Sequence, residues 1–185
     1  MPTQSRRDRA REERRELIVR TARMLAESDG WDHVTTRRLA EQVDYSQPVL
    51  YSHFKNMQAI ATAVALEGFA ELAEALSNAL ESDGLRGLAR AYLAYAEEHP
   101  AVYEAMFIRS TDLVFGGADS PPALLDAFNA IRSSVTPYAD DSETLTEVFW
   151  SALHGLASLG NSARLRPDAK LARVDLLLAT LTKGA

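Results

Sequence analysis

The chain has 185 residues, of which 46% are hydrophobic and 25% charged, the composition of an ordinary soluble globular protein. It has no cysteine, so disulfides and thiolate metal sites are excluded, and no apolar run approaches the roughly 18 to 20 residues that span a bilayer. Because no apolar signal-peptide core follows the arginine-rich start, we expect a cytoplasmic protein without a membrane partner.

Charge is distributed unevenly along the chain, although the net charge of −6 by itself argues against a nucleic-acid partner. Residues 1–55 hold eleven Lys/Arg and nine Asp/Glu, whereas residues 56–185 hold nine and seventeen. Six arginines crowd the beginning: Arg6, Arg7, Arg9, Arg11, Arg14 and Arg15. Such a cluster suffices for phosphate attraction, since screening confines exposed charges to about 8 Å at physiological salt. The alternative is a solubilising run on a long helix.

Helices are predicted over nearly the whole chain, and strand signals are weak. The first spans about residues 7–28 and ends at Asp29-Gly30, where glycine suits a left-handed cap. Two short amphipathic runs follow at residues 36–43 and 47–54, with Thr35 or Thr36 as the N-cap of the first run.

These two runs have the pattern of a helix-turn-helix. Apolar residues recur at spacings of three and four, namely Leu39, Ala40 and Val43, then Val49, Leu50 and Phe54. Two short helices joined by so brief a turn must cross at a steep angle. The outer side of the second run carries polar side chains that can hydrogen-bond to base edges or phosphates: Gln47, Tyr51, Ser52 and His53. The segment therefore points to DNA.

The remaining helices are predicted from breaks at Asp83-Gly84, Pro100 and Pro121-Pro122. They span about residues 57–82, 85–98, 101–109, 122–135, 143–161 and 168–182, with Ser142 as the cap of the fifth and a loop over 111–120 containing Gly116-Gly117. The predicted fold is all-α. A three-helix DNA-binding domain (residues 1–56) precedes a larger helical domain (residues 57–185).

The run L-A-E-Q-V-D-Y-S-Q-P-V-L-Y-S-H-F-K-N resembles the helix-turn-helix of the TetR family of transcriptional regulators, in which the last part commonly reads L-Y-x-H-F-K. Residues 150–155, W-S-A-L-H-G, resemble the W-x-x-x-H-G signature of one subgroup. Two positions depart from the family: Asp44 stands where glycine is usual, and Val49 where threonine is frequent. The resemblance implies a set of DNA-contacting residues: Thr36, Arg37, Gln47, Pro48, Val49, Tyr51, Ser52, His53 and Lys55.

The same resemblance implies a small-molecule pocket among the C-terminal helices. Trp150 and His154 are four residues apart and share a helical face, and Tyr103, Met106 and Phe107 could line the opposite wall. Ordinary core packing is the alternative for each aromatic residue. A buried histidine needs a partner, which for His154 is either a ligand or a structural hydrogen bond. The effector itself is unknown.

The last two long helices are predicted to form a homodimer interface. Small residues at Ser151, Gly155 and Ser158 allow a second backbone to approach closely, and the final helix adds apolar area at Val174, Leu178 and Leu181. A two-fold dimer would place two recognition helices in successive major grooves of double-stranded DNA, on a palindromic operator.

Two other functions compete with a ligand-released repressor. An enzyme is disfavoured because no carboxylate completes a relay with Ser151 and His154, and the four histidines lack metal-ligand spacing. No metal or other cofactor is expected. The second alternative is a small-ligand sensor of the same fold with weak or no DNA binding. The departures from the family pattern at Asp44 and Val49 would then reflect the loss of DNA binding.

Overall fold

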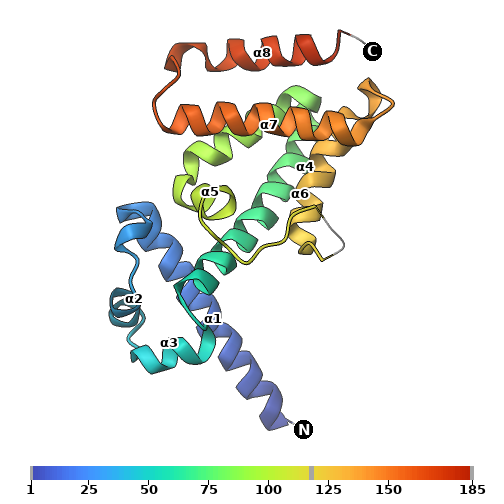
Figure 1. The fold of residues 1–185 in the computed structure, drawn as a ribbon. Helices are drawn as coiled ribbons and strands as arrows, with labels where there is room; N and C mark the ends of the chain where they lie inside the picture. Colours follow the sequence, from blue (N-terminus) through green and yellow to red (C-terminus); the bar gives the residue numbers. More distant parts are fainter. Residues whose placement is uncertain (1, 117–118, 184–185) are drawn as a thin grey trace. The chain divides into compact units, whose positions relative to one another are not determined.

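The computed structural model describes residues 2–116 and 119–183, with side chains from Arg6 onward. This part of the chain contains helices and no strand, which confirms the predicted all-α fold (Figure 1). The elements are α1 (Pro2–Asp29), η1 (Trp31–His33), α2 (Thr36–Val43), α3 (Gln47–His53), α4 (Met57–Glu98), α5 (Pro100–Phe107), α6 (Pro122–Val135), η2 (Thr136–Tyr138), α7 (Ser142–Asn161), η3 (Pro167–Ala169) and α8 (Lys170–Leu181).

The chain forms two units, each discontinuous in sequence. The N-terminal unit comprises Met1–Gly68 and Ala101–Leu113, and the C-terminal unit comprises Phe69–Pro100 and Val114–Ala185. These units do not coincide with the segments 1–56 and 57–185, because α5 belongs to the N-terminal unit. The functional division at residue 56 stays a prediction.

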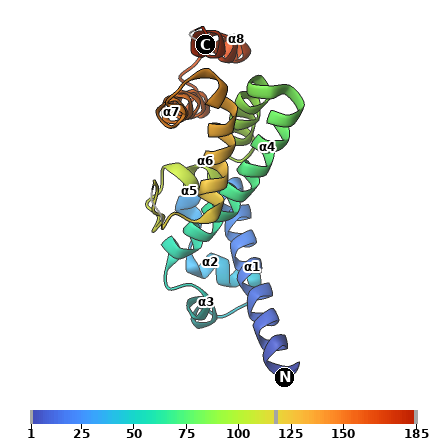
Figure 2. The same cartoon turned by 90° about the vertical axis from the view of Figure 1, so that its right-hand side faces the viewer.

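In the N-terminal unit, α2 and α3 pack on the same side of α1 (Figures 1 and 2). Apolar residues from the three helices meet there and are buried: Ile18, Ala22, Leu39, Val43 and Leu50. Thr35 caps α2, as predicted, because its hydroxyl accepts a hydrogen bond from the Arg38 backbone N–H at 3.2 Å. The turn between α2 and α3 begins at Asp44, whose φ of 56° and ψ of 40° lie in the left-handed region.

Helix α5 is attached to α1 by polar contacts that join distant parts of the sequence. The Glu27 carboxylate accepts hydrogen bonds from the backbone N–H groups of Ala101 and Val102, both at 3.1 Å. These groups belong to the first turn of α5, where backbone donors have no intrahelical partner. The buried Trp31 Nε1 donates to the Ala101 carbonyl at 2.8 Å. Glu27 therefore acts as a cap supplied from another helix.

The C-terminal unit contains the rest of α4 together with α6, α7 and α8. The predicted break appears inside α4, where Asp83 and Gly84 have non-helical backbone angles. The core of this unit includes Tyr92, Phe149 and Leu153, all fully buried. Helix α7 begins one residue earlier than predicted and is capped by Asp141, not Ser142, because the Asp141 carboxylate accepts from the Thr144 N–H at 3.0 Å.

Helix α8 runs antiparallel beside α7 in both views (Figures 1 and 2). Val174 is its one buried residue in the described range, with 1% of its surface exposed. Ion pairs hold its first half to α4, where Lys170 contacts Glu97 at 2.6 Å and Arg86 contacts Asp175 at 2.9 Å. Of the loop expected over 111–120, Gly117 lies outside the described residues, and the described part is non-helical.

Candidate nucleic-acid interface and effector region

The short helix α3 buries one side and exposes the other, as its sequence pattern predicts. Leu50 and Phe54 are 1% and 5% exposed, whereas Tyr51 on the outer side is 52% exposed. Gln47 and Pro48 are also exposed, at the beginning of the helix. The exposed side therefore presents an amide, a phenol and the first turn of a helix to an incoming partner.

Several of the predicted DNA-contacting side chains already have partners within the N-terminal unit. The Ser52 hydroxyl donates to the Val49 carbonyl at 2.7 Å, one turn earlier in its own helix. On α2, Arg37 Nε pairs with Glu41 at 2.9 Å, while Thr36 is half-buried. Lys55 is 70% exposed and pairs with Asp112 at 3.1 Å.

His53 sits at the end of α3 beside the basic part of α1. Its Nδ1 is buried and has no hydrogen-bond partner among the described residues. Burial lowers the pKa of His53 below its ordinary value, and the positive charges of Arg11, Arg14 and Arg15 lower it further. The imidazole is therefore neutral at pH 7 and offers its ring as a neutral donor or acceptor.

Several arginines of α1 lie close to the end of α3. Their spacing in the sequence does not reveal this proximity. The Arg15 guanidinium stacks over the Phe54 ring, 4.9 Å from its centroid. Arg11 and Arg14 are exposed and close enough to His53 to act on its charge. Three members of the predicted basic cluster, Arg11, Arg14 and Arg15, thus lie beside the predicted helix-turn-helix in the N-terminal unit.

Arg38 on α2 forms an ion pair with Asp29 at the end of α1. The hydrogen bond from Arg38 lowers the pKa of the exposed Asp29 carboxyl. The pair joins the end of α1 to α2 across the 3-10 turn that contains Trp31, a contact that the sequence pattern does not reveal.

The five residues predicted for the effector pocket fall into two units. Tyr103 and Met106 are buried in the N-terminal unit, where the half-buried Phe107 packs on Tyr103 with ring centroids 4.8 Å apart. Trp150 and His154 are half-buried in the C-terminal unit.

Trp150 and His154 take part in hydrogen-bonded pairs of the C-terminal unit. Trp150 Nε1 donates to the hydroxyl of the buried Tyr92 at 3.1 Å. His154 Nε2 and the Ser158 hydroxyl lie 3.3 Å apart, one turn along α7. Burial lowers the pKa of His154, so this imidazole is neutral at pH 7. The predicted structural hydrogen bond of His154 is present, which leaves its role toward a ligand as a prediction.

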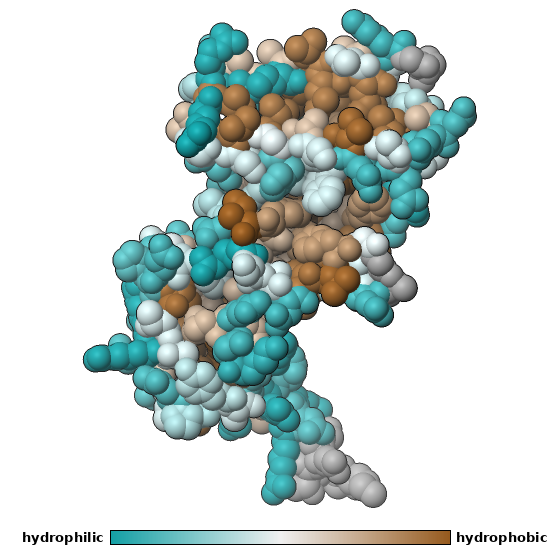
Figure 3. Space-filling model, viewed as in Figure 1, coloured by the Kyte–Doolittle hydropathy of each residue, from teal (hydrophilic) through white to brown (hydrophobic). Residues whose placement is uncertain are grey.

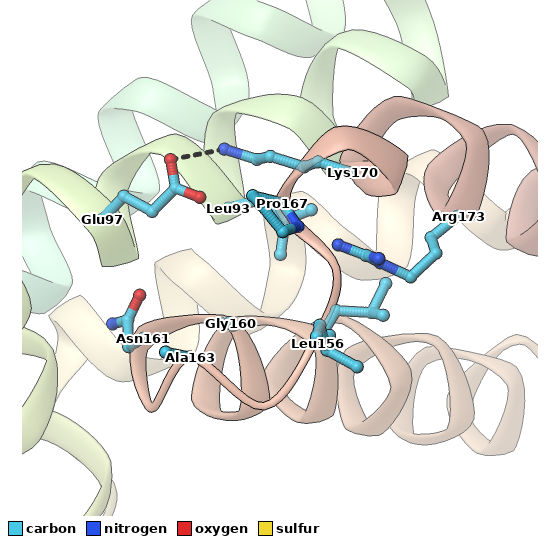
Figure 4. Close-up of a pocket in the computed structure, with 11 residues that line it drawn as sticks. Leu93, Glu97, Leu156, Gly160, Asn161, Ala163, Pro167, Lys170 and Arg173 are labelled. Carbon is cyan, nitrogen blue, oxygen red and sulfur yellow. Dashed lines mark hydrogen bonds and ion pairs between the residues drawn. The ribbon is translucent and has the colours of Figure 1, made fainter.

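A cavity is present in each unit, and neither of these two cavities is lined by the five predicted residues. The cavity of the C-terminal unit has about 290 Å³ and lies where α4, α7 and α8 meet (Figure 4). Glu97 and Asn161 stand on one side of it and Lys170 and Arg173 on the other. The cavity of the N-terminal unit has about 400 Å³ and is lined by Trp31 and eight further residues.

The predicted dimer-interface residues differ in exposure. Ser151 is exposed, and the others except Val174 are half-buried: Gly155, Ser158, Leu178 and Leu181. Val174 is already buried by its own unit. Apolar side chains gather over α7 and α8 on the face shown in Figure 3. Exposed members on these two helices are Val148, Leu159, Leu171 and Leu176.

No group of three or more His, Cys, Asp or Glu side chains that could hold a metal ion occurs within residues 2–116 and 119–183. Nor does the described part of the chain contain a helix with the length and apolarity needed to cross a membrane.

The fold and the exposed helix pair define a helix-turn-helix protein, and comparison with known proteins identifies its family. Residues 18–64 match the model of bacterial regulatory proteins of the tetR family, and residues 85–181 match the tetracyclin repressor-like C-terminal domain. The second match covers more than half of the chain. The chain therefore belongs to the TetR family of transcriptional regulators.

Individual relatives agree with this assignment. The HTH-type transcriptional regulator Rv0681 of Mycobacterium tuberculosis is 30% identical over 154 residues, which cover 78% of this chain and 69% of that protein. The class C tetracycline repressor protein of Escherichia coli is 49% identical over 51 residues, covering 28% of this chain and 23% of the repressor. The crystal structure of the regulatory protein SCO4313 covers 94% of this chain and 97% of its own, with a TM-score of 0.75 at 20% identity.

Proposed function

We propose that the chain is a cytoplasmic homodimeric repressor that a small molecule releases from a palindromic operator. The observation that carries the proposal is the two-sided α3, which buries Leu50 while exposing Gln47 and Tyr51, with Phe54 buried directly after it. Glutamine can pair bidentately with adenine in the major groove, and a tyrosine hydroxyl can reach base edges or phosphates. A short helix that only filled a core would not carry these groups outward.

The remaining predicted DNA contacts are assigned from the charge and the hydrogen-bonding groups of their side chains. Arg37 and Lys55 supply positive charge for phosphates, and Thr36 and Ser52 supply hydroxyls. Val49 offers methyl groups that can meet a thymine methyl, and Pro48 and His53 complete the same surface. Val49 is half-buried, so its contribution depends on the DNA approaching α3 closely.

The dimer is proposed to form through the outer faces of α7 and α8. Val148, Ser151, Gly155 and Leu159 recur along α7 at spacings of three and four, and Val148 is 58% exposed. On α8, Leu176 is 69% exposed. A second copy that covers these side chains removes apolar surface from water and sets two recognition helices on one operator.

The effector is proposed to bind in the C-terminal unit near Trp150 and His154. Their hydrogen bonds to Tyr92 and Ser158 can be exchanged for bonds to a ligand at modest cost. Ligand binding would then weaken operator binding, and the operator would weaken ligand binding by the same factor. Because the chain has two tryptophans, a ligand that quenches the wild type and not Trp150→Phe would locate the site.

DNA binding is tested with the duplex from upstream of the gene itself, followed by fluorescence anisotropy over a series of salt concentrations. We expect affinity that falls steeply with salt, and a loss of roughly fivefold to 100-fold for Tyr51→Ala, the range of a single base or phosphate contact. Tyr138→Ala, at a half-buried tyrosine of the C-terminal unit, is the matched control. Absent or salt-independent binding would contradict the proposal and favour a ligand sensor without an operator.

A further inference from the structure

We propose that Asp112 sets the strength of DNA binding by holding the Lys55 ammonium and competing with the DNA backbone for it. The inference rests on the proposed function, because it takes Lys55 as a phosphate contact. It assigns a role to a residue outside the helix-turn-helix, in the segment that follows α5.

The geometry gives each oxygen of the Asp112 carboxylate its own partner. Lys55 Nζ lies 3.1 Å from Oδ2, and Gln58 Nε2 donates to Oδ1 at 3.0 Å. Lys55 stands in the turn between α3 and α4, and Gln58 is the second residue of α4. The carboxylate therefore joins the turn after α3 and the first turn of α4 from a position 54 residues beyond Gln58.

The second hydrogen bond matters for what happens when DNA arrives. A phosphate that contacts the Lys55 ammonium must either share its three N–H donors with Asp112 or draw the side chain away from the carboxylate. In either case Gln58 keeps the carboxylate in place. A negative charge then remains close to the phosphate, well inside the screening length of about 8 Å. Both the weakened or broken ion pair and the remaining repulsion oppose DNA binding.

Exposure limits the size of the effect. The side chains of Lys55 and Asp112 are 70% and 51% exposed, so water and salt screen the pair. Exposed ion pairs of this kind change an equilibrium by up to about fivefold. The expected gain on removing the Asp112 charge is therefore about two- to fivefold in DNA affinity.

This pair differs from the other ion pair at the predicted surface. Arg37 is paired with Glu41, which lies on the same helix and moves with it. Asp112 comes instead from the segment after α5, so a shift of that segment can release Lys55 while α3 stays intact. In this way the segment after α5 affects DNA binding through the charge of Asp112.

The test is a double-mutant cycle on the full chain. Wild type, Asp112→Asn, Lys55→Gln and the double variant are compared by anisotropy with the upstream duplex at low and physiological salt. Asparagine keeps the acceptor for Gln58 and removes only the charge. Asp140→Asn, at an exposed position of the C-terminal unit, changes the net charge equally and serves as control. Thermal melting confirms that each variant folds.

We expect Asp112→Asn to bind about two- to fivefold more tightly than wild type, with a smaller gain at higher salt. The gain should disappear in the Lys55→Gln background. A gain that persists there, or that matches Asp140→Asn, would overturn the inference, as would unchanged affinity of Asp112→Asn beside a wild type that binds. Failure of the wild type to bind DNA in a salt-dependent manner would overturn the proposed function together with this inference.

Discussion

Replacing Asp44 by glycine tests whether the turn of the helix-turn-helix stores backbone strain. Asp44 has φ 56° and ψ 40°, and its backbone N–H still bonds to the Ala40 carbonyl. A residue with a Cβ pays roughly 1 to 2 kcal/mol in this region. Glycine avoids that cost but loses about 0.5 to 1 kcal/mol more chain entropy on folding. We therefore expect Asp44→Gly to stabilise the N-terminal unit by up to about 1.5 kcal/mol.

The measurement uses urea unfolding followed by tryptophan fluorescence, because the two tryptophans lie in different units. Trp31 reports the N-terminal unit and Trp150 the C-terminal unit. The series Asp44→Gly, Asp44→Asn and Asp44→Ala should rank from most to least stable, since asparagine tolerates the left-handed region and alanine does not. Ala163, with φ 54°, is the matched position, and Ala163→Gly should stabilise the C-terminal unit.

Equal stability of Asp44→Ala and Asp44→Gly would contradict this prediction, because the left-handed backbone would then carry no cost. An appreciable change in the DNA affinity of Asp44→Gly would contradict it as well. The turn's hydrogen bond uses backbone atoms, and glycine keeps them. Unchanged affinity with raised stability would show that Asp44 departs from the family residue without altering the reading surface.

Three further perturbations follow from the structure. Glu27→Ala should destabilise the N-terminal unit by about 2 kcal/mol in urea unfolding, since it removes two hydrogen bonds from a charged acceptor to the first turn of α5. Gly68→Ala should cost about 1 to 3 kcal/mol in the same assay, because a Cβ there would lie 2.4 Å from Val102 Cγ1 and 2.8 Å from Met106 Sδ. The lowered pKa of His53 means that the folded state binds its proton less readily than the unfolded state, so stability should fall as pH drops below about 6.5. His53→Gln should reduce that loss in unfolding experiments at pH 7 and pH 5, and an unchanged loss would contradict the assignment.

The helix-turn-helix was predictable because its determinants are local. The bounds of α2 match the prediction, and α3 ends one residue before the predicted end. Spacings of three and four fix which side chains face inward, and Thr35 supplies its cap within one turn. Asp44, which departs from the glycine usual in the TetR pattern, adopts a left-handed conformation that glycine accommodates most easily.

Contacts between distant polar residues were not predictable in the same way. Nothing in the sequence near Glu27 indicates that its carboxylate caps α5, and nothing near Lys55 indicates Asp112. An apolar pattern shows that a helix face is buried without showing what buries it. Tyr103 and Met106 illustrate this, because both are buried in the N-terminal unit while their role in a ligand pocket stays a prediction.

The ion pairs of the N-terminal unit bear on how an acidic protein can bind DNA. Arg37 and Lys55, two of the predicted phosphate contacts, are each paired with a carboxylate, so a phosphate at either position would compete with an existing partner. The number of cations alone would therefore overestimate the affinity that these two residues contribute. The same competition would leave two carboxylates near the phosphates, and their repulsion would increase as salt is lowered. The logarithm of the affinity should then rise less steeply at low salt than the number of basic residues implies, and removing one such carboxylate should steepen it.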